Sequence, residues 1–139
     1  MKSRGADAVF DYHDPDCAAK IREYSNNSLR YIFDTISTKD SFPICAAAFP
    51  AESTEELQLV ALLPLDGWTR TDVTTTVVLA YTSIGEAFSK FGMDVPPIPE
   101  HYEWASRFWK IHAKFLAEGK IKPHPVAKRE GGLAAVPNG

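Results

Sequence analysis

The sequence predicts an α/β protein built on a parallel β-sheet with flanking helices. Three observations support this class. Segments rich in branched and aromatic residues alternate with helix-forming segments, the connections between them are short, and Leu57 to Leu63 (LQLVALL) is almost wholly apolar. An apolar run of this kind suits the centre of a parallel sheet better than its edge. Such alternation favours right-handed crossovers between parallel strands.

The first part of the chain predicts a strand followed by a helix. Lys2 to Gly5 is typical of a last helical turn closed by a glycine C-cap, and Ala8 to Asp11 is predicted to be a short buried strand. The pair Asp14-Pro15 predicts the start of the next helix, because aspartate caps helices and proline suits their first position. That helix is expected over Cys17 to Tyr24, before the breaker pair Asn26-Asn27.

The alternation continues through the middle of the chain. Arg30 to Ile36 (RYIFDTI) is aromatic and branched, as a buried strand should be. Ser37 and Asp40 can cap a helix over residues 41–48. After the apolar run, Val73 to Tyr81 (VTTTVVLAY) predicts a further strand.

The last part of the chain predicts two helices separated by an extended segment. Residues 85–91 are expected to form a short helix, and the prolines between 96 and 99 impose an extended stretch. A long helix is then expected over Glu100 to Glu118, ending at Gly119. Its apolar stripe, expected to pack into a core, consists of Trp104, Phe108, Ile111, Phe115 and Leu116.

Composition limits the classes of function. The 139 residues suffice for one core, and 45% hydrophobic and 24% charged residues are typical of a globular protein. A formal net charge of -3 gives no support for nucleic-acid binding or for binding a membrane surface. There is no apolar run near ~18 residues and no leader, so no spanning helix is expected. Cys17 and Cys45 are expected to be free thiols in a reducing, cytoplasmic compartment.

The candidate site follows from position, because common catalytic and nucleotide-binding motifs are absent from the sequence. In open parallel sheets, ligands bind beyond the carboxyl ends of the strands. Tyr12, Ser37-Thr38 and Leu63-Pro64 follow the predicted strands. Tyr12 can lie against an adenosine or bond a phosphate, or it can be an ordinary exposed turn residue. The acidic group around His13 favours a turn and helix cap over a metal site, so no metal is expected.

Several motifs, taken in their order along the chain, resemble those of a known family. They are KSRGADAVFDYHDPD, RYIFDTIS, VALLP, TSIGE and GKIKPHPVAKREGGL. With this set the chain resembles the carboxyl-terminal portion of medium-chain dehydrogenase/reductases, and in particular the fungal trans-acting enoyl reductases, the group of the lovastatin enoyl reductase.

The resemblance implies an NADP-dependent oxidoreductase that acts without zinc. In that family, NADPH reduces an α,β-unsaturated thioester carried by a polyketide synthase, in secondary-metabolite biosynthesis. By match to the family's motifs, Tyr12, Leu62 and Leu63 would bind the cofactor. The segment Tyr81, Thr82, Ser83, Ile84 and Gly85 would line the substrate channel. No catalytic residue is assigned within the chain, and family members are often monomeric.

The resemblance also implies an incomplete, Rossmann-type sheet. Residues 1–118 would be part of the NADP-binding domain, and residues 119–139 would begin the return to a catalytic domain. The first βαβ unit, with its phosphate-binding loop, and the amino-terminal catalytic domain would precede Met1. The chain alone is therefore expected to bind NADPH weakly. The alternative is a non-catalytic interaction module that pairs with another chain through apolar surface and a bare sheet edge.

Overall fold

The computed structural model describes residues 1–90, 92–128 and 130–138. The chain forms two compact units, Met1–Tyr81 and Thr82–Gly139, and each is considered by itself. The predicted domain boundary between residues 118 and 119 remains a prediction. Among the residues that the structure describes, no helix has the length and apolar character needed to span a membrane.

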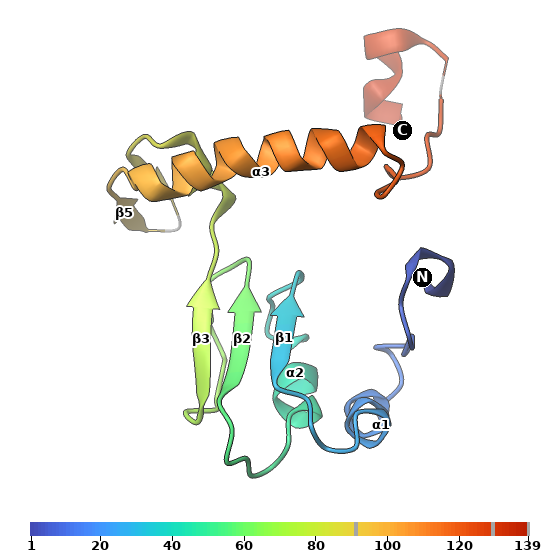
Figure 1. Ribbon diagram of the computed structural model, residues 1–139, viewed down its shortest axis with the longest axis vertical. Helices are drawn as coiled ribbons and strands as arrows, with labels where there is room; N and C mark the ends of the chain where they lie inside the picture. Colours follow the sequence, from blue (N-terminus) through green and yellow to red (C-terminus); the bar gives the residue numbers. More distant parts are fainter. Residues whose placement is uncertain (91, 129, 139) are drawn as a thin grey trace. The chain divides into compact units, whose positions relative to one another are not determined.

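The first unit contains a parallel three-stranded sheet (Figure 1). Its strands are β1 (Tyr31–Asp34), β2 (Leu57–Ala61) and β3 (Val73–Val77), in the order β1-β2-β3. Both pairings are parallel. The predicted α/β class is thus confirmed, and the apolar run around residue 59 does form the central strand.

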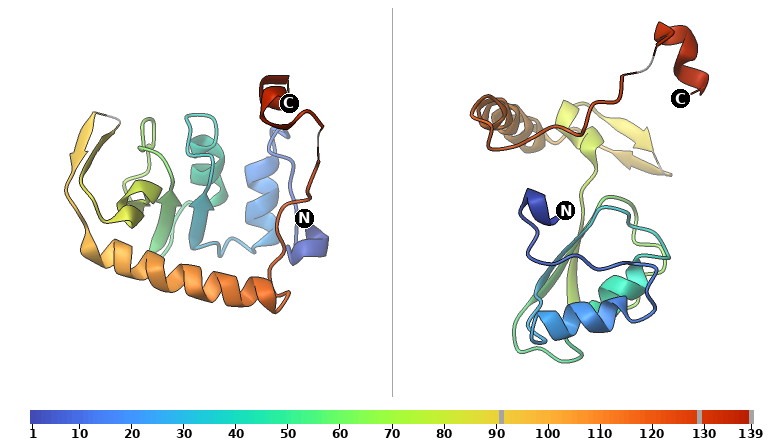
Figure 2. Two further views of the ribbon diagram at one scale, coloured as in Figure 1. Left: turned by 90° about the horizontal axis from the view of Figure 1, so that it is seen from above. Right: turned by 90° about the vertical axis from the view of Figure 1, so that its right-hand side faces the viewer.

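One helix precedes the sheet and a second connects its first two strands. They are α1 (Cys17–Tyr24) and α2 (Phe42–Ala48), and α2 lies against one face of the sheet with α1 beside it (Figure 2). The helix α1 has the predicted bounds, and it ends where Asn26 and Asn27 adopt φ angles of 51° and 56°. Asparagine tolerates this left-handed conformation better than most residues, which explains the break.

The core lies between α2 and the sheet face that it covers. Alternate residues of β2 point into it, since Leu57, Leu59 and Ala61 are buried. The ring of Phe42, from α2, meets Trp68 edge-on at 5.9 Å between centroids. Burial of these apolar side chains is the main stabilising contribution. The central cluster comprises Phe49, Leu57, Leu59 and Val73, with Ile32, Cys45, Leu65 and Trp68 packed against it.

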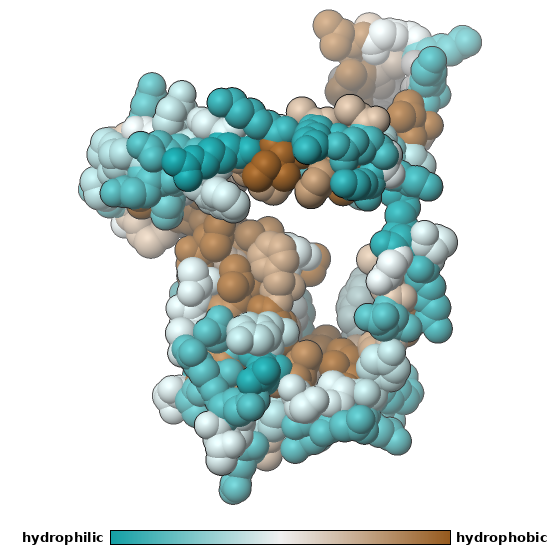
Figure 3. All heavy atoms as spheres, viewed as in Figure 1, coloured by the Kyte–Doolittle hydropathy of each residue, from teal (hydrophilic) through white to brown (hydrophobic). Residues whose placement is uncertain are grey.

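The opposite face of β1 is exposed. Tyr31 and Phe33 keep 64% and 62% of their surface accessible, and hydrophobic surface is visible over the strands in Figure 3. The prediction of a buried strand over Arg30 to Ile36 is confirmed as a strand over Tyr31–Asp34, but it is wrong about burial on this face, while Ile32 and Asp34 point inward. Aromatic and branched residues indicate a strand, but they do not say whether both of its faces are covered.

Two expectations near the beginning of the chain need correction. Ala8 to Asp11 forms no strand, and Val9 is half exposed, because this extended segment pairs with no strand in the described sheet. The helix α1 begins at Cys17 after Asp16, and Asp14 accepts the Asp16 N–H in the preceding turn at 2.9 Å. The expected terminal turn is present as the 3-10 helix η1 (Lys2–Arg4), closed by Gly5.

The second unit begins within a 3-10 helix, η2 (Ala80–Ile84), and continues with a small hairpin. The strands β4 (Phe88–Lys90) and β5 (Met93–Val95) pair in antiparallel fashion. The helix expected over residues 85–91 is therefore wrong at residues 88–90, and residue 91 lies outside the described residues. Gly92, with φ of 72°, supplies the left-handed conformation that suits a tight hairpin turn.

The helix α3 (Pro99–Ala117) matches the predicted long helix to within one residue at each end. Gly119, with φ of 68°, follows it as expected, and a last 3-10 helix η3 covers Gly132–Asn138. The expected core packing of its stripe is wrong, because no residue of α3 is buried and Trp104 is 61% exposed. An apolar stripe marks the face that a helix can bury, and it does not supply the covering surface.

Candidate functional site

The candidate site lies at the carboxyl ends of the three parallel strands. The last register pairs of the sheet join Asp34, Ala61 and Val77. Beyond them, the N–H of Val78 donates to the carbonyl oxygen of Ala61 at 2.8 Å. Ligands of open α/β sheets bind at this edge, so the residues just past it are the ones that can meet a ligand.

Asp34 organises the turn that leaves β1. Its Oδ1 accepts the N–H groups of Ile36 and Ser37, each at 2.9 Å, and its Oδ2 accepts the Ser41 hydroxyl at 2.6 Å. The residue is 6% exposed. A buried carboxylate is costly unless it accepts hydrogen bonds, and here it accepts several that fix the chain between β1 and α2.

The surroundings of Asp34 also set two pKa values. Burial acts to raise the pKa of Asp34, but hydrogen bonds from Ser41, Ser37 and Ile36 outweigh it, so this pKa is below its ordinary value. Cys45 places its Sγ 3.7 Å from Asp34 Oδ2. Burial, and then the nearby carboxylate, raise the pKa of the Cys45 thiol to about 12. This thiol is protonated at neutral pH and is a poor nucleophile.

Ser37 links the end of β1 to the end of β2. Its hydroxyl donates to the carbonyl oxygen of Asp34 at 2.7 Å and accepts the N–H of Leu62 at 2.8 Å. Ser37 is 3% exposed and has a φ angle of 55°, a conformation that is uncommon for residues other than glycine. Sequence analysis expected Ser37 to cap the following helix, but the N-cap of α2 is Ser41.

The predicted cofactor residues of the first unit are accessible. Leu62 is half-buried just past β2, and Leu63 is 37% exposed. Tyr12 is 69% exposed, and its ring lies 3.9 Å from that of His13 between centroids. Their roles as cofactor ligands stay predictions.

The predicted substrate-lining residues fall in both units. Tyr81 ends the first unit, and Thr82 to Gly85 begin the second. In the second unit, Thr82 Oγ1 lies 2.9 Å from His101 Nδ1. Gly85 has a φ angle of 75°, and a Cβ added there would come within 3.1 Å of Tyr102 Cβ. The prediction that the five residues line one channel stays a prediction.

Sequence analysis missed the roles of Asp34 and Ser41 at this edge. A signal was present, since an aspartate ends an otherwise apolar strand and serines follow it three and seven residues later. Short polar side chains at a strand end commonly bond nearby backbone N–H groups. The pattern predicts an ordered turn, but it does not predict that Ser37 reaches a residue twenty-five positions later.

The acidic group near the beginning of the chain forms local turn contacts. Asp11 Oδ1 accepts the backbone N–H of His13 at 3.0 Å, and Asp14 pairs with Lys20. In the part of the chain that the structure describes, no cluster of His, Cys, Asp and Glu side chains could hold a metal ion. Both cysteines are free thiols, and Cys17 is buried.

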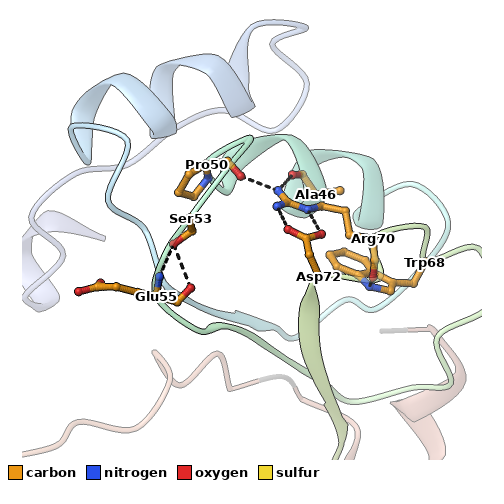
Figure 4. A network of polar contacts seen from close by, with 7 residues as sticks. All are labelled: Ala46, Pro50, Ser53, Glu55, Trp68, Arg70 and Asp72. Atoms are coloured by element: carbon orange, nitrogen blue, oxygen red, sulfur yellow. Dashed lines mark hydrogen bonds and ion pairs between the residues drawn. The ribbon is translucent and has the colours of Figure 1, made fainter.

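A second polar network holds the carboxyl end of α2 (Figure 4). Arg70 Nη1 donates to the carbonyl oxygens of Ala46 at 3.1 Å and Pro50 at 2.9 Å. Asp72 accepts from Arg70 Nε at 2.9 Å and also pairs with Nη2. The guanidinium lies 5.7 Å from the centroid of the Phe49 ring. Because the last carbonyls of a helix lack helical partners, this arginine stabilises the end of α2.

The parallel sheet with α2 on one face, and the ordered turns at its carboxyl edge, define an α/β protein of the kind that binds ligands at strand ends. No protein-family model matches the chain. A trans-enoyl reductase of Alternaria alternata is 42% identical over 100% of this chain and 39% of its own length. A dual trans-enoyl reductase/FAD-dependent monooxygenase of Aspergillus terreus is also 42% identical, over 99% of this chain and 19% of its own length.

A third relative, a trans-enoyl reductase of Fusarium mangiferae, is 37% identical over 99% of this chain and 37% of its own length. The chain thus spans less than half the length of each of these relatives. The chain is therefore similar to a part of fungal trans-enoyl reductases. This confirms the family resemblance found in the sequence.

Proposed function

We propose that this chain forms part of the NADPH-binding, Rossmann-type domain of a trans-acting enoyl reductase. The whole protein would reduce an α,β-unsaturated thioester held by a polyketide synthase, in the cytoplasm of a fungal cell. The observation that carries the proposal is the 42% identity to a trans-enoyl reductase along 100% of the chain. Identity at this level over a whole segment supports a shared role for that segment.

Two features of the carboxyl edge of the sheet support the binding of a dinucleotide there. Leu62 and Leu63 offer apolar contacts to a nicotinamide ring, and NADPH would supply a hydride there. The negative charge of Asp34 is directed into the protein, where N–H and O–H groups stabilise it through hydrogen bonds. Asp34 would therefore repel a cofactor phosphate less strongly than an unpaired carboxylate would.

Tyr12 and the segment 81–85 complete the proposed contacts. The Tyr12 side chain is 69% exposed, so its ring is available to an adenosine and its hydroxyl to a phosphate. Residues 81–85 would contact the acyl chain of the substrate. The proton that completes the reduction would come from a group that is not assigned within this chain.

A hybrid protein tests the proposal. Residues 1–139 would replace the matching segment of the Alternaria alternata relative, and NADPH oxidation would be followed with an α,β-unsaturated acyl thioester. We expect the hybrid to retain NADPH-dependent reduction. Leu63→Glu should raise the KM for NADPH at least about tenfold, because it puts a charge against the nicotinamide.

The control variant is Val126→Glu, which adds the same charge at a side chain that is 79% exposed. It should leave the KM for NADPH unchanged. A hybrid that folds and binds no NADPH, while the parent enzyme is active, would refute the proposed function.

The second candidate function is a non-catalytic module that pairs with another chain. The exposed aromatic residues favour it, since Trp104 and Trp109 of α3 are 61% and 63% exposed. Exposed aromatic residues of this size often mark interaction surfaces. Size-exclusion chromatography of the chain tests this candidate, because a monomer across a wide range of concentrations contradicts self-pairing.

A further inference from the structure

One serine hydroxyl joins the turn after β1 to the residue after β2. Leu62 lies just past the last register pair of the sheet, Asp34 with Ala61, so its N–H is beyond the regular ladder. Ser37 Oγ accepts this N–H at 2.8 Å and donates its own hydrogen to the carbonyl oxygen of Asp34 at 2.7 Å. The donor and an acceptor site of the hydroxyl are thus both in use.

Ser37 makes this bridge from an unfavourable backbone conformation. Its φ angle is 55°, and the left-handed region costs a residue other than glycine about 1 kcal/mol. Such a conformation persists where the surroundings hold it in place. Here Asp34 Oδ1 accepts the N–H groups of both Ile36 and Ser37, each at 2.9 Å. The carboxylate therefore fixes the serine, and the serine fixes Leu62.

We infer that Ser37 and Asp34 are positioning residues that set where Leu62 and Leu63 lie against the nicotinamide end of NADPH. The inference rests on the proposed function, in which the two leucines contact the cofactor. Neither Ser37 nor Asp34 needs to touch the cofactor for this role. Ser37 acts through the backbone of Leu62, and Asp34 acts through the turn that presents Ser37.

Loss of the Ser37 hydroxyl contact is expected to weaken binding of the nicotinamide end of the cofactor and not of the adenosine end. Loss of the bridge frees the Leu62 N–H and lets the chain after β2 shift, which weakens contacts to the nicotinamide. The adenosine end would bind at Tyr12, and the bridge does not involve Tyr12. A general loss of stability would instead weaken binding of both ends alike.

Two ligands and three variants, each variant made in the hybrid protein described above, test the inference. The probes are NADPH and adenosine 2′,5′-bisphosphate, which lacks the nicotinamide, each titrated to millimolar concentration and followed by amide NMR shifts. Ser37→Gly removes the hydroxyl and suits the left-handed backbone, so it isolates the bridge from the strain. Asp34→Asn keeps the side-chain shape and loses the charge, and it serves as the second variant where Ser37→Gly folds poorly.

Ser53→Ala is the matched control. Ser53 Oγ also donates to a carbonyl oxygen and accepts an N–H, both of Glu55, at 2.9 and 3.1 Å. It does so in the loop that precedes β2, away from the carboxyl edge. Its loss should alter neither the affinity for NADPH nor the exchange of the Leu62 amide.

We expect Ser37→Gly to weaken NADPH binding about fivefold, to speed Leu62 amide exchange, and to leave bisphosphate affinity within about twofold. Asp34→Asn should give the same selectivity. Equal weakening of both probes, or NADPH binding like that of the unaltered hybrid, overturns the inference and leaves the proposed function standing. Absence of an NADPH response at Leu62 and Leu63 in the unaltered hybrid overturns both.

Discussion

His101, in the first turn of α3, places its Nδ1 2.9 Å from the Oγ1 of Thr82, in the segment proposed to line the substrate channel. The two residues are nineteen positions apart and belong to the same unit. The contact connects η2 to the beginning of the long helix. The order of the proposed substrate segment therefore depends on a residue to which sequence analysis gave no role.

Thr82→Val should loosen this segment. Valine keeps the branched shape of threonine and removes the hydroxyl that meets His101. The Gly85 N–H, which donates to the Thr82 carbonyl oxygen at 3.2 Å, should exchange about fivefold faster, as expected for one lost hydrogen bond. Amide exchange by NMR measures this. Thr74→Val, which removes a hydroxyl bonded to Glu56 in the first unit, is the control, and equal exchange at Gly85 in all three proteins would contradict the prediction.

Gly85→Ala should cost more stability than the same change at Gly92. Their φ angles are 75° and 72°, so the backbone penalty of about 1 kcal/mol is shared. A Cβ at Gly85 would meet Tyr102 at 3.1 Å, whereas a Cβ at Gly92 meets nothing within 4 Å. We expect an additional loss of about 1 kcal/mol at Gly85 from this crowding. Denaturant unfolding of both variants measures the difference. Tyr102→Ala keeps the Cβ but removes the ring carbons at 3.2 and 3.4 Å, so it should reduce the difference in part.

Elements that depend on local sequence signals are predicted correctly, whereas elements that depend on contacts with distant residues are not. The helix Cys17–Tyr24 and the central strand at Leu57 follow from local signals, namely breakers, periodicity and an apolar run, and both are confirmed. The strand expected at Ala8 to Asp11 is absent, because a strand needs a partner that local sequence does not specify. The hairpin at residues 88–95 was missed for the same reason.

The candidate site was also predicted only in part from the sequence. Position after a strand identified the neighbourhood of Leu63 and Ser37. The bridge from Ser37 to Leu62 and the carboxylate of Asp34 beneath it depend on side chains that meet only in the folded sheet. The resemblance to enoyl reductases named the leucines, and the structure supplies the residues that hold them.

Asp34→Ala should destabilise the first unit strongly. It leaves the N–H groups of Ile36 and Ser37 and the Ser41 hydroxyl without their acceptor in a part-buried turn. We expect a loss of about 3 kcal/mol in the free energy of unfolding, measured by urea denaturation followed by circular dichroism. The exposed Asp7, changed to alanine, is the control and should shift the free energy by less than about 0.5 kcal/mol. Similar values for the two variants would refute the structural role of Asp34.

Arg70→Met should release the carboxyl end of α2. Methionine keeps much of the apolar stem beside Phe49 but loses the bonds to the carbonyl oxygens of Ala46 and Pro50. We expect a loss of about 2 kcal/mol, because Asp72 is also left without its partner. The stability of Arg70→Lys should fall between that of the unaltered chain and that of Arg70→Met, since lysine keeps the charge and lacks the planar guanidinium. A change no larger than that of Arg107→Met, on α3, would contradict this assignment.

Acid should destabilise the first unit in part through Asp34. Burial acts to raise its pKa, but hydrogen bonds from Ser41, Ser37 and Ile36 outweigh it and leave the pKa below the ordinary value. A carboxyl whose pKa is lowered by folding contributes stability above its unfolded pKa and loses it as the pH falls through the folded pKa. The free energy of unfolding should therefore fall as the pH drops below about 4. Asp34→Asn, which cannot titrate, should make that fall shallower. Urea unfolding at a series of pH values measures both slopes, and parallel curves for Asp34→Asn and the unaltered chain would show that Asp34 contributes no acid sensitivity.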